Sequence, residues 1–341
     1  MEGASDRIML LRELGEFGLI ERIAALAADD PRVVVGVGDD AALLDLGGPQ
    51  LVAVTTDAML QDRHFQLDWL SPEEIGRRAV AGSLSDIAAM GATPVGVFCT
   101  AGFPADGSAE TAEAMLRGVA LGAEAAGAVL AGGDLIASER VLLDLTAIGL
   151  VQHGQQLTRD GARPGQLLAV TGALGAPAMA VAALLASSHA QLHGDAWEAV
   201  RERFARPQPR IRAGRAMAAS GLVAAAIDIS DGLVQDAGHI ARRSGLRAVI
   251  EGGRVPVAEG CVELAATVDA DPARAALAGG EDFELLVSLD EADFTRVAKL
   301  PAVAEVGLTV VGYLEDGEGA IAVDDAGDEI DLPRGGWNHY A

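Results

Sequence analysis

The segment SPEEIGRRAVAGSLSDIAAMG, residues 71–91, decides the fold of the first half of the chain. Its start carries the signals of a helix N-terminus. Ser71 can act as the N-cap, Pro72 suits the first helical position and Glu74 completes a Ser-x-x-Glu capping box. Gly91 is a typical residue to end such a helix. The segment therefore predicts a helix that begins after Ser71 and stops at Gly91.

Asp86 is the unusual residue of this helix, because helical spacing places it on the same face as Ile75 and Met90. A buried carboxylate without a partner costs several kcal/mol, so a cation or a strong donor is expected beside it. The partner could be an arginine of the same helix, Arg77 or Arg78, or a metal ion. Both arginines point to other faces of the helix, which favours the metal.

Asp86 belongs to one of several short segments in which acidic residues stand beside glycine or hydroxyl residues. These segments are GVGDDA (36–41), TTD (55–57), SLSD (83–86), GGD (132–134), DISDG (228–232) and GGED (279–282). Turn formation alone explains any single one of them, but their number suggests that the carboxylates converge.

Converging carboxylates need cations, because two unit charges about 4 Å apart repel by on the order of 4 kcal/mol at an effective dielectric near 20. Carboxylate oxygens with few His or Cys select Mg²⁺, Mn²⁺ or Ca²⁺ over zinc. Magnesium prefers a few carboxylates together with substrate phosphates, and the approaches to these acids are glycine-rich. The pattern therefore indicates nucleoside triphosphate chemistry.

Composition agrees with a folded, acidic protein. The chain has 341 residues, which corresponds to about two domains at the usual ~150 residues per domain. It carries 25 Lys and Arg against 50 Asp and Glu, a net charge of −25, and is 50% hydrophobic. The hydrophobicity excludes disorder, and the acidity argues against a nucleic-acid partner, which needs a basic surface. An acidic protein can still bind phosphates through cations.

The sequence predicts a cytoplasmic protein without a membrane partner. Cys99 and Cys261 show no spacing typical of a zinc site or a disulfide framework. Residues 1–14 lack the basic-then-apolar order of a signal peptide, and no uncharged apolar run reaches the roughly 18 residues of a membrane helix.

Strand-like runs alternate with helical stretches along the chain. We expect strands at 33–37, 51–56, 128–131, 141–150, 166–171, 224–229, 247–251, 283–289 and 308–313, and further helices at 109–126, 176–186 and 233–244. A polar stretch at 201–212 leads into another helix that ends near Gly221. The segment TRDGARPG (158–165) has the composition of a linker, so we divide the chain into domains 1–153 and 154–341.

Three motifs imitate other sites. GVGDDA fits a dinucleotide-binding pattern, but two aspartates would lie where a pyrophosphate must meet bare N–H groups. DISDG begins like a calcium loop, yet His239 stands where a bidentate glutamate belongs. His189 and His193 are four residues apart without the glutamate of an HExxH zinc motif. No G-x-x-x-x-G-K-[ST] phosphate loop is present.

The ordered motif set resembles that of the thiamine-monophosphate kinase family. This family shares an ATP-binding superfamily with aminoimidazole ribonucleotide synthetase and selenophosphate synthetase. Besides the acidic segments, the resemblance rests on GEFGLIERI (15–23), His64-Phe65, SLSDIAAMGA (83–92), LTRDGARPG (157–165), GGEDFELL (279–286) and GWNHY (336–340). Ser83 and Leu135 depart from the pattern, where the family often has Asn and Thr, which puts fine nucleotide contacts in doubt.

The resemblance implies a fold and a reaction. The fold is α+β, a two-domain aminoimidazole ribonucleotide synthetase-like fold whose N-terminal sheet pairs with that of a second copy into a β-barrel, as in a homodimer. The reaction is direct in-line transfer of the γ-phosphoryl group of ATP to thiamine monophosphate, giving thiamine diphosphate, with several Mg²⁺ ions.

The resemblance also implies roles for individual residues. Asp86, Asp231 and Arg159 would be catalytic, and Gly133, Asp134, Arg159 and Ser230 would bind ATP. His64, Glu281 and Trp337 would bind thiamine monophosphate, although His64 could be a plain loop residue and Trp337 could pin the C-terminus. Metal ligands would be Asp40, Thr55, Thr56, Asp57, Asp86, Asp134, Asp228 and Asp231.

Two other functions remain open from the sequence. A superfamily member that uses ATP on a different acceptor would share most of these motifs. A non-catalytic protein that binds Mg-nucleotide would share the acidic loops but would not consume ATP. A turnover assay separates both from the kinase.

Overall fold

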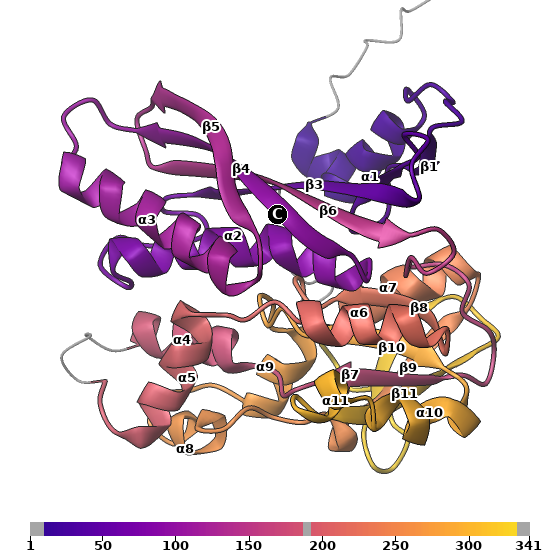
Figure 1. The fold of residues 1–341 in the computed structure, drawn as a ribbon. Helices are drawn as coiled ribbons and strands as arrows, with labels where there is room; N and C mark the ends of the chain where they lie inside the picture. The colour runs from indigo at the N-terminus through magenta and orange to yellow at the C-terminus, as the bar shows by residue number, and fades with distance from the viewer. Residues whose placement is uncertain (1–9, 187–191, 333–341) are drawn as a thin grey trace, which may run out of the picture.

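The computed structural model describes residues 10–186 and 192–332, which form two α+β halves around two separate sheets (Figure 1). The first sheet is six-stranded with the order β1-β2-β3-β6-β4-β5. Its strands are β1 (Val33–Val35), β2 (Ala42–Leu44), β3 (Gln50–Leu60), β4 (Thr93–Phe103), β5 (Val129–Ala137) and β6 (Leu142–Gln152). All neighbouring strands are antiparallel except β4 and β5, which are parallel.

Helices α2 (Pro72–Ala89) and α3 (Ala109–Ala125) cover the face of this sheet that is turned toward the second half (Figure 1). The two helices approach closely because glycines face each other. A Cβ at Gly76 would lie 1.9 Å from the Met115 carbonyl, and one at Gly118 would lie 2.1 Å from the Glu73 carbonyl. Helix α1 (Leu11–Ala24) precedes β1.

The second sheet is also six-stranded, with the order β12-β9-β11-β7-β10-β8. Its strands are β7 (Leu167–Thr171), β8 (Val223–Asp228), β9 (Arg247–Glu251), β10 (Leu285–Leu289), β11 (Leu308–Glu315) and β12 (Gly319–Val323). The helices of this half are α4 (Ala176–Ala186), α5 (Asp195–Ala205), α6 (Ile211–Ser220), α7 (Leu233–Ser244), α8 (Cys261–Ala265), α9 (Pro272–Ala278), α10 (Glu291–Ala298) and α11 (Pro301–Ala304), with a 3-10 turn at Gly252–Arg254.

The two halves share one hydrophobic core around α2. Ile87 and Ala88 of α2, Phe204 of α5 and Met217 of α6 all belong to a single buried cluster. Residues 153–166 connect the two sheets. A site at the junction of the halves is therefore held by packed helices on both sides.

Within the described part of the chain neither sheet closes into a barrel by itself, and the barrel expected between two copies stays a prediction. The short strands β2 and β12 were not predicted from the sequence. Strand β4, which contains Pro94, Gly96 and Gly102, was not predicted, because these residues weaken a strand pattern. None of the helices in the described ranges is long and apolar enough to cross a membrane.

In the second half the predicted helices α4, α6 and α7 are confirmed, whereas α5 and the short helices α8 to α11 were not predicted. The stretch 201–212 was expected to be a polar connection, yet its first residues complete α5. Trp197, Val200 and Phe204 recur on one buried face of α5 and hold the helix against the core, so the arginines between them lie on its other faces.

Candidate active site

Three aspartates from both halves converge between the sheets. Asp40 lies in the loop between β1 and β2, Asp86 lies near the end of α2, and Asp228 is the last residue of β8. One carboxylate oxygen of each lies within 4.8 Å of the others. We call these three residues the acidic cluster. Their convergence is the arrangement that the sequence predicted for a divalent cation.

Strand β3 delivers further oxygen atoms to the acidic cluster. The Thr55 hydroxyl donates a hydrogen bond of 2.6 Å to Asp86, and the charge of Asp57 contributes to the raised pKa of Asp86. Gly82 of α2 makes room for Asp57, because a Cβ there would lie 2.2 Å from the Asp57 Oδ2 atom. Thr56 is exposed while Thr55 is buried, so its side chain lies on the opposite face of the strand and is not brought to the cluster.

The partner of Asp86 is neither of the two helix arginines that the sequence left open. The Arg77 Nε atom lies 3.1 Å from Glu73, one helical turn away on the protein surface. Arg78 pairs with Glu281 and with the Phe204 carbonyl. The alternative of an arginine partner within α2 was wrong, because Arg77 pairs with Glu73 and Arg78 pairs with Glu281 of the second half.

Burial and repulsion hold the acidic cluster in a partly protonated state. Burial, together with the charge of Asp40, raises the pKa of Asp228 to about 8. Burial and the charge of Asp228 raise the pKa of Asp86 well above its usual range. Burial also raises the pKa of Asp40, although Arg159 opposes this shift. A divalent cation would remove the repulsion that causes these shifts.

Arg159 is the guanidinium that the fold brings to the acidic cluster. Its Nε atom donates to Asp40 at 3.0 Å and its backbone N–H donates to Asp39 at 3.2 Å. The preceding residue, Thr158, accepts a hydrogen bond of 2.9 Å from the backbone of Ala226 in β8. The connecting segment is thus fixed to the second sheet, and it carries Arg159 to the first domain's acids.

The acidic cluster fits a hard divalent cation. The Asp40 Oδ2 and Asp228 Oδ2 atoms are buried and have no hydrogen-bond partner among residues 10–186 and 192–332. Buried carboxylate oxygens are normally hydrogen-bonded, so these two positions are suited to metal coordination. The donor set contains only oxygen, which favours Mg²⁺ or Mn²⁺ over zinc.

A second acidic group surrounds the start of α7. Ligand atoms of Asp231, Asp236 and His239 lie within 4.8 Å of one another. Asp236 accepts hydrogen bonds from the backbone N–H groups of Ser230, Asp231 and Gly232 at 3.1–3.2 Å, so it shapes this loop. Burial lowers the pKa of His239 to about 3, so its ring is neutral at pH 7.

Asp236, His239 and Asp39 were not predicted as site residues. In the sequence, His239 was noted only because it stands where a calcium loop has a glutamate. Asp39 was noted only because it would interfere with a bound dinucleotide. Asp236 stands four residues after Gly232, where a carboxylate can cap the loop that starts a helix. That spacing was the available signal.

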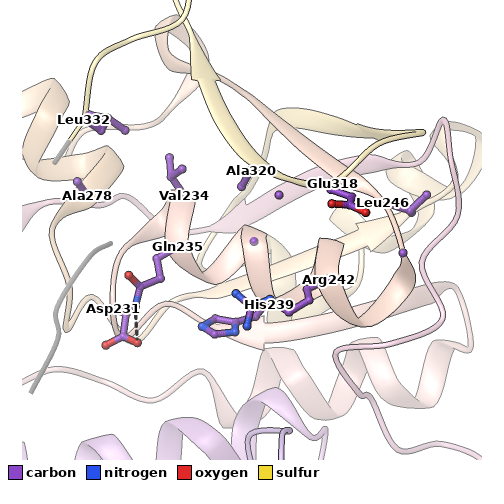
Figure 2. A pocket seen from close by; sticks show the side chains of 13 residues that line it. Asp231, Val234, Gln235, His239, Arg242, Leu246, Ala278, Glu318, Ala320 and Leu332 are labelled. Atoms are coloured by element: carbon purple, nitrogen blue, oxygen red, sulfur yellow. Dashed lines mark hydrogen bonds between the residues drawn. The ribbon is translucent and has the colours of Figure 1, made fainter. Parts of the chain in front are cut away.

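A cavity of about 670 Å³ opens beside Asp231 (Figure 2). Helix α7 forms one wall through Val234, Gln235 and His239, and Ala320 of β12 forms part of the other. The Gln235 amide donates a hydrogen bond of 2.9 Å to Asp231 at one end of the cavity. The cavity therefore joins an acidic end to a largely apolar body.

The remaining residues that the sequence singled out lie outside the two acidic groups or outside the described residues. The His64 Nδ1 atom accepts a hydrogen bond of 2.9 Å from the Leu60 backbone, in the turn after β3. Gly133 and Asp134 lie in β5, and Asp134 belongs to neither acidic group within the described residues. A Cβ at Gly133 would lie 1.9 Å from the Cys99 carbonyl, so close strand packing also explains this glycine. Trp337 and His189 lie outside the described residues.

Family models match both halves of the chain. The N-terminal domain of AIR synthase related proteins matches residues 38–151, and the C-terminal domain of these proteins matches residues 163–325. The two-sheet fold with acidic loops at the junction of its halves thus defines a member of the AIR synthase related class.

Relatives that align with most of the chain show which family within this class it belongs to. The chain is 35% identical to a thiamine-monophosphate kinase of Mycobacterium tuberculosis, over 97% of this chain and 91% of that protein. It is 38% identical to one of Methanopyrus kandleri, over 88% and 90%. A solved structure described as AaThiL complexed with AMPPCP and TMP matches with a TM-score of 0.84 and 28% identity, over 98% of this chain and 100% of that one. The chain belongs to the thiamine-monophosphate kinase family.

Proposed function

We propose that this protein transfers the γ-phosphoryl group of ATP to the phosphate of thiamine monophosphate. The observation that carries the proposal is the acidic cluster of Asp40, Asp86 and Asp228 at the junction of the halves. A structural relative that binds an ATP analogue together with TMP supports the choice of both substrates. A phosphate oxygen of the acceptor forms a bond to the γ-phosphorus as the bond from that phosphorus to the β–γ bridging oxygen breaks, and ADP leaves.

The acidic cluster would hold Mg²⁺, and Asp57 and Asp231, whose charges act on Asp86 and Asp228, would contribute to further ions. Mg²⁺ bound there would neutralise the charge that develops on the transferring and leaving oxygens. Several ions are proposed because the carboxylates come as two groups, around Asp86 and around Asp231. Asp134 would join them only through a rearrangement or a second copy of the chain.

The chain's own residues position the reactants. Arg159 can exchange its contact with Asp40 for phosphate oxygens, where its planar guanidinium neutralises charge. Ser230 and Gly133 would contact ATP. The acceptor phosphate is already ionised at neutral pH, so the reaction needs no general base. Catalysis then consists mainly of charge neutralisation and in-line orientation, without a covalent enzyme intermediate.

Thiamine monophosphate would place its phosphate near Asp231 and its rings toward Glu281, whose backbone N–H donates to the Ser230 carbonyl at 2.8 Å. His64, Glu281 and Trp337 would contact the acceptor. An indole ring can stack on the flat, positively charged thiazolium and adds a cation–π interaction.

A homodimer is proposed from the outer strand of the first sheet. Strand β5 ends the sheet, and its whole length is exposed. Leu135 and Val129 are 68% and 61% exposed. An exposed apolar edge strand is normally covered, and a second copy of this chain could pair there so that the two sheets form a barrel.

The experiment that tests the function measures product formation by purified protein. ATP, Mg²⁺ and thiamine monophosphate are combined, and each is omitted in turn, while thiamine diphosphate and ADP are followed by chromatography. Product only in the complete mixture supports the kinase. ATP consumption without thiamine diphosphate would indicate another acceptor, and nucleotide binding without ATP consumption would indicate a non-catalytic protein.

A further inference from the structure

Arg78 occupies an unusual position for a charged residue. It lies on α2 about two helical turns before Asp86, and it is only 1% exposed. Its guanidinium donates a hydrogen bond to the Phe204 carbonyl at the end of α5 and stacks on the Phe204 ring, 4.3 Å from the centroid. It also forms an ion pair with Glu281. Arg78 therefore joins the helix that carries Asp86 to two elements of the second half.

The loop that carries Glu281 has a strained backbone. Glu281 and Phe283 have φ angles of 65° and 51°, in the left-handed region that non-glycine residues rarely adopt. Their N–H groups donate to the carbonyls of Ser230 and Ile229 at 2.8 and 2.9 Å. A Cβ at Gly280 would lie 2.3 Å from the Ser230 carbonyl, so only glycine permits this approach. The loop is thus fixed against the segment that carries Asp228 and Asp231.

The two oxygens of the Glu281 carboxylate differ in environment. Oε2 faces Arg78, whose side chain is completely buried. Oε1 has no hydrogen-bond partner among the described residues, and the Glu281 side chain is 37% exposed. One oxygen is held by a buried cation, and the other belongs to a side chain that is partly exposed. This arrangement orients a carboxylate toward a cationic or N–H donating ligand.

We propose that Arg78 is a positioning residue for the acceptor. It fixes the orientation of Glu281 so that the outer carboxylate oxygen meets the cationic or amino-bearing portion of thiamine monophosphate, and it does not itself touch the reacting atoms. The inference rests on the proposed function and on the role of Glu281 in acceptor binding. Through Arg78, helix α2 would influence the affinity for thiamine monophosphate as well as carry Asp86.

The test is a double-mutant cycle with Arg78→Met, Glu281→Ala and the double variant. We expect Arg78→Met to raise the KM for thiamine monophosphate about tenfold, as expected for the loss of one well-oriented charge-assisted hydrogen bond. The KM for ATP should stay unchanged. In the Glu281→Ala background the Arg78 substitution should change neither KM further, because the group that it positions is absent.

Arg77→Met is the matched control, since Arg77 is the neighbouring arginine on α2 and pairs with Glu73 at the surface. It should leave both KM values unchanged. Arg78→Lys is measured in parallel because it keeps the positive charge while losing the fork geometry, and it should show a smaller rise in the KM for thiamine monophosphate. Thermal melting reports whether each variant folds.

A purely structural role for Arg78 would give a different pattern. The melting temperature would fall, kcat would fall with the folded fraction, and the effects of Arg78→Met and Glu281→Ala on the KM for thiamine monophosphate would be independent. That result, or unfolding of both Arg78 variants, would overturn the inference. Failure of the proposed function would appear separately, because the wild-type protein would then form no thiamine diphosphate.

Discussion

At the scale of single residues, the acidic cluster is a set of carboxylates that cannot all be ionised without help. Burial pushes Asp86 and Asp228 toward their neutral forms, and the charge of Asp40 adds to the shift of both. Arg159 compensates only Asp40 directly. The residues that make the site useful for binding cations are therefore residues that destabilise the metal-free protein.

Asp86→Asn should abolish turnover at any workable Mg²⁺ concentration, a loss of at least about 10²-fold in kcat/KM. The metal-free protein should melt at the same or a higher temperature, because burial penalises an ionised carboxylate at this position and asparagine carries no charge. Steady-state kinetics and thermal melting in a chelator check both effects. Asp68→Asn changes an exposed aspartate outside the site and is the control. Near-wild-type activity of Asp86→Asn would exclude Asp86 from the metal site.

The same shifts predict how the stability of the metal-free protein depends on pH. The pKa of Asp228 is raised from 3.8 to about 8 on folding, so the folded state binds this proton more tightly than the unfolded state. The resulting stabilisation is present below about pH 4 and is lost as the pH rises through about 8, with a slope of at most about 1.4 kcal/mol per pH unit for one group.

In a chelator, the melting temperature should therefore fall as the pH is raised across this interval. Added Mg²⁺ should restore stability most strongly at the alkaline end, where the carboxylates are ionised. Melting curves at several pH values, with and without Mg²⁺, measure this. A melting temperature in chelator that rises steadily toward pH 8 would show that the carboxylates do not repel one another as described.

At the scale of elements, α2 organises the molecule. Its N-terminus is held by Ser71, which accepts from the Glu74 backbone N–H, while the Glu74 side chain accepts from Ser71 and pairs with Arg201 of α5. Its middle carries Arg78 and its end carries Asp86. One helix therefore connects the capping region, the second half and the acidic cluster.

Ser71→Ala should lower the free energy of unfolding by about 1 kcal/mol, because one N-cap hydrogen bond is lost at an end of α2 remote from Asp86. Neither kcat nor either KM should change. Chemical denaturation and steady-state kinetics provide the two readouts. A large loss of activity with little loss of stability would mean that the capping region also shapes the site.

The features of α2 that could be predicted from the sequence depend only on residues near one another in the chain. The capping box, the apolar face and the position of Asp86 all follow from residues within one segment, and the structure confirms the helix and its cap. The partner of Arg78 could not be predicted in this way, because Glu281 lies in a loop distant in sequence. Helix α5 was missed because its apolar face alternates with arginines that resemble a polar connection.

At the scale of the whole molecule, the site exists only because two α+β halves pack around α2. Each half has its own sheet, and Asp40 and Asp86 come from one half while Asp228 comes from the other. The chain length and the linker-like segment 158–165 indicated two domains. It did not indicate which strand would be left exposed at an edge, because strand order depends on contacts distant in sequence.

The exposed β5 strand gives a prediction about assembly. The wild-type protein should sediment as a dimer, and Leu135→Glu should shift it toward monomer by placing a charge on the apolar strand. Leu185→Glu is the matched control, because Leu185 of α4 is 72% exposed but belongs to the other half. Sedimentation velocity distinguishes the species. A monomeric wild-type protein would exclude pairing through β5.

The most direct test of the central claim follows the phosphoryl group itself. Wild-type protein is incubated with Mg²⁺, thiamine monophosphate and ATP labelled at the γ-phosphate, and the label is located after separation of the products. We expect the label in thiamine diphosphate and none on the protein. Release of labelled inorganic phosphate should not increase with turnover. Label that appears only in inorganic phosphate or on the protein would contradict direct transfer between the two substrates at the acidic cluster.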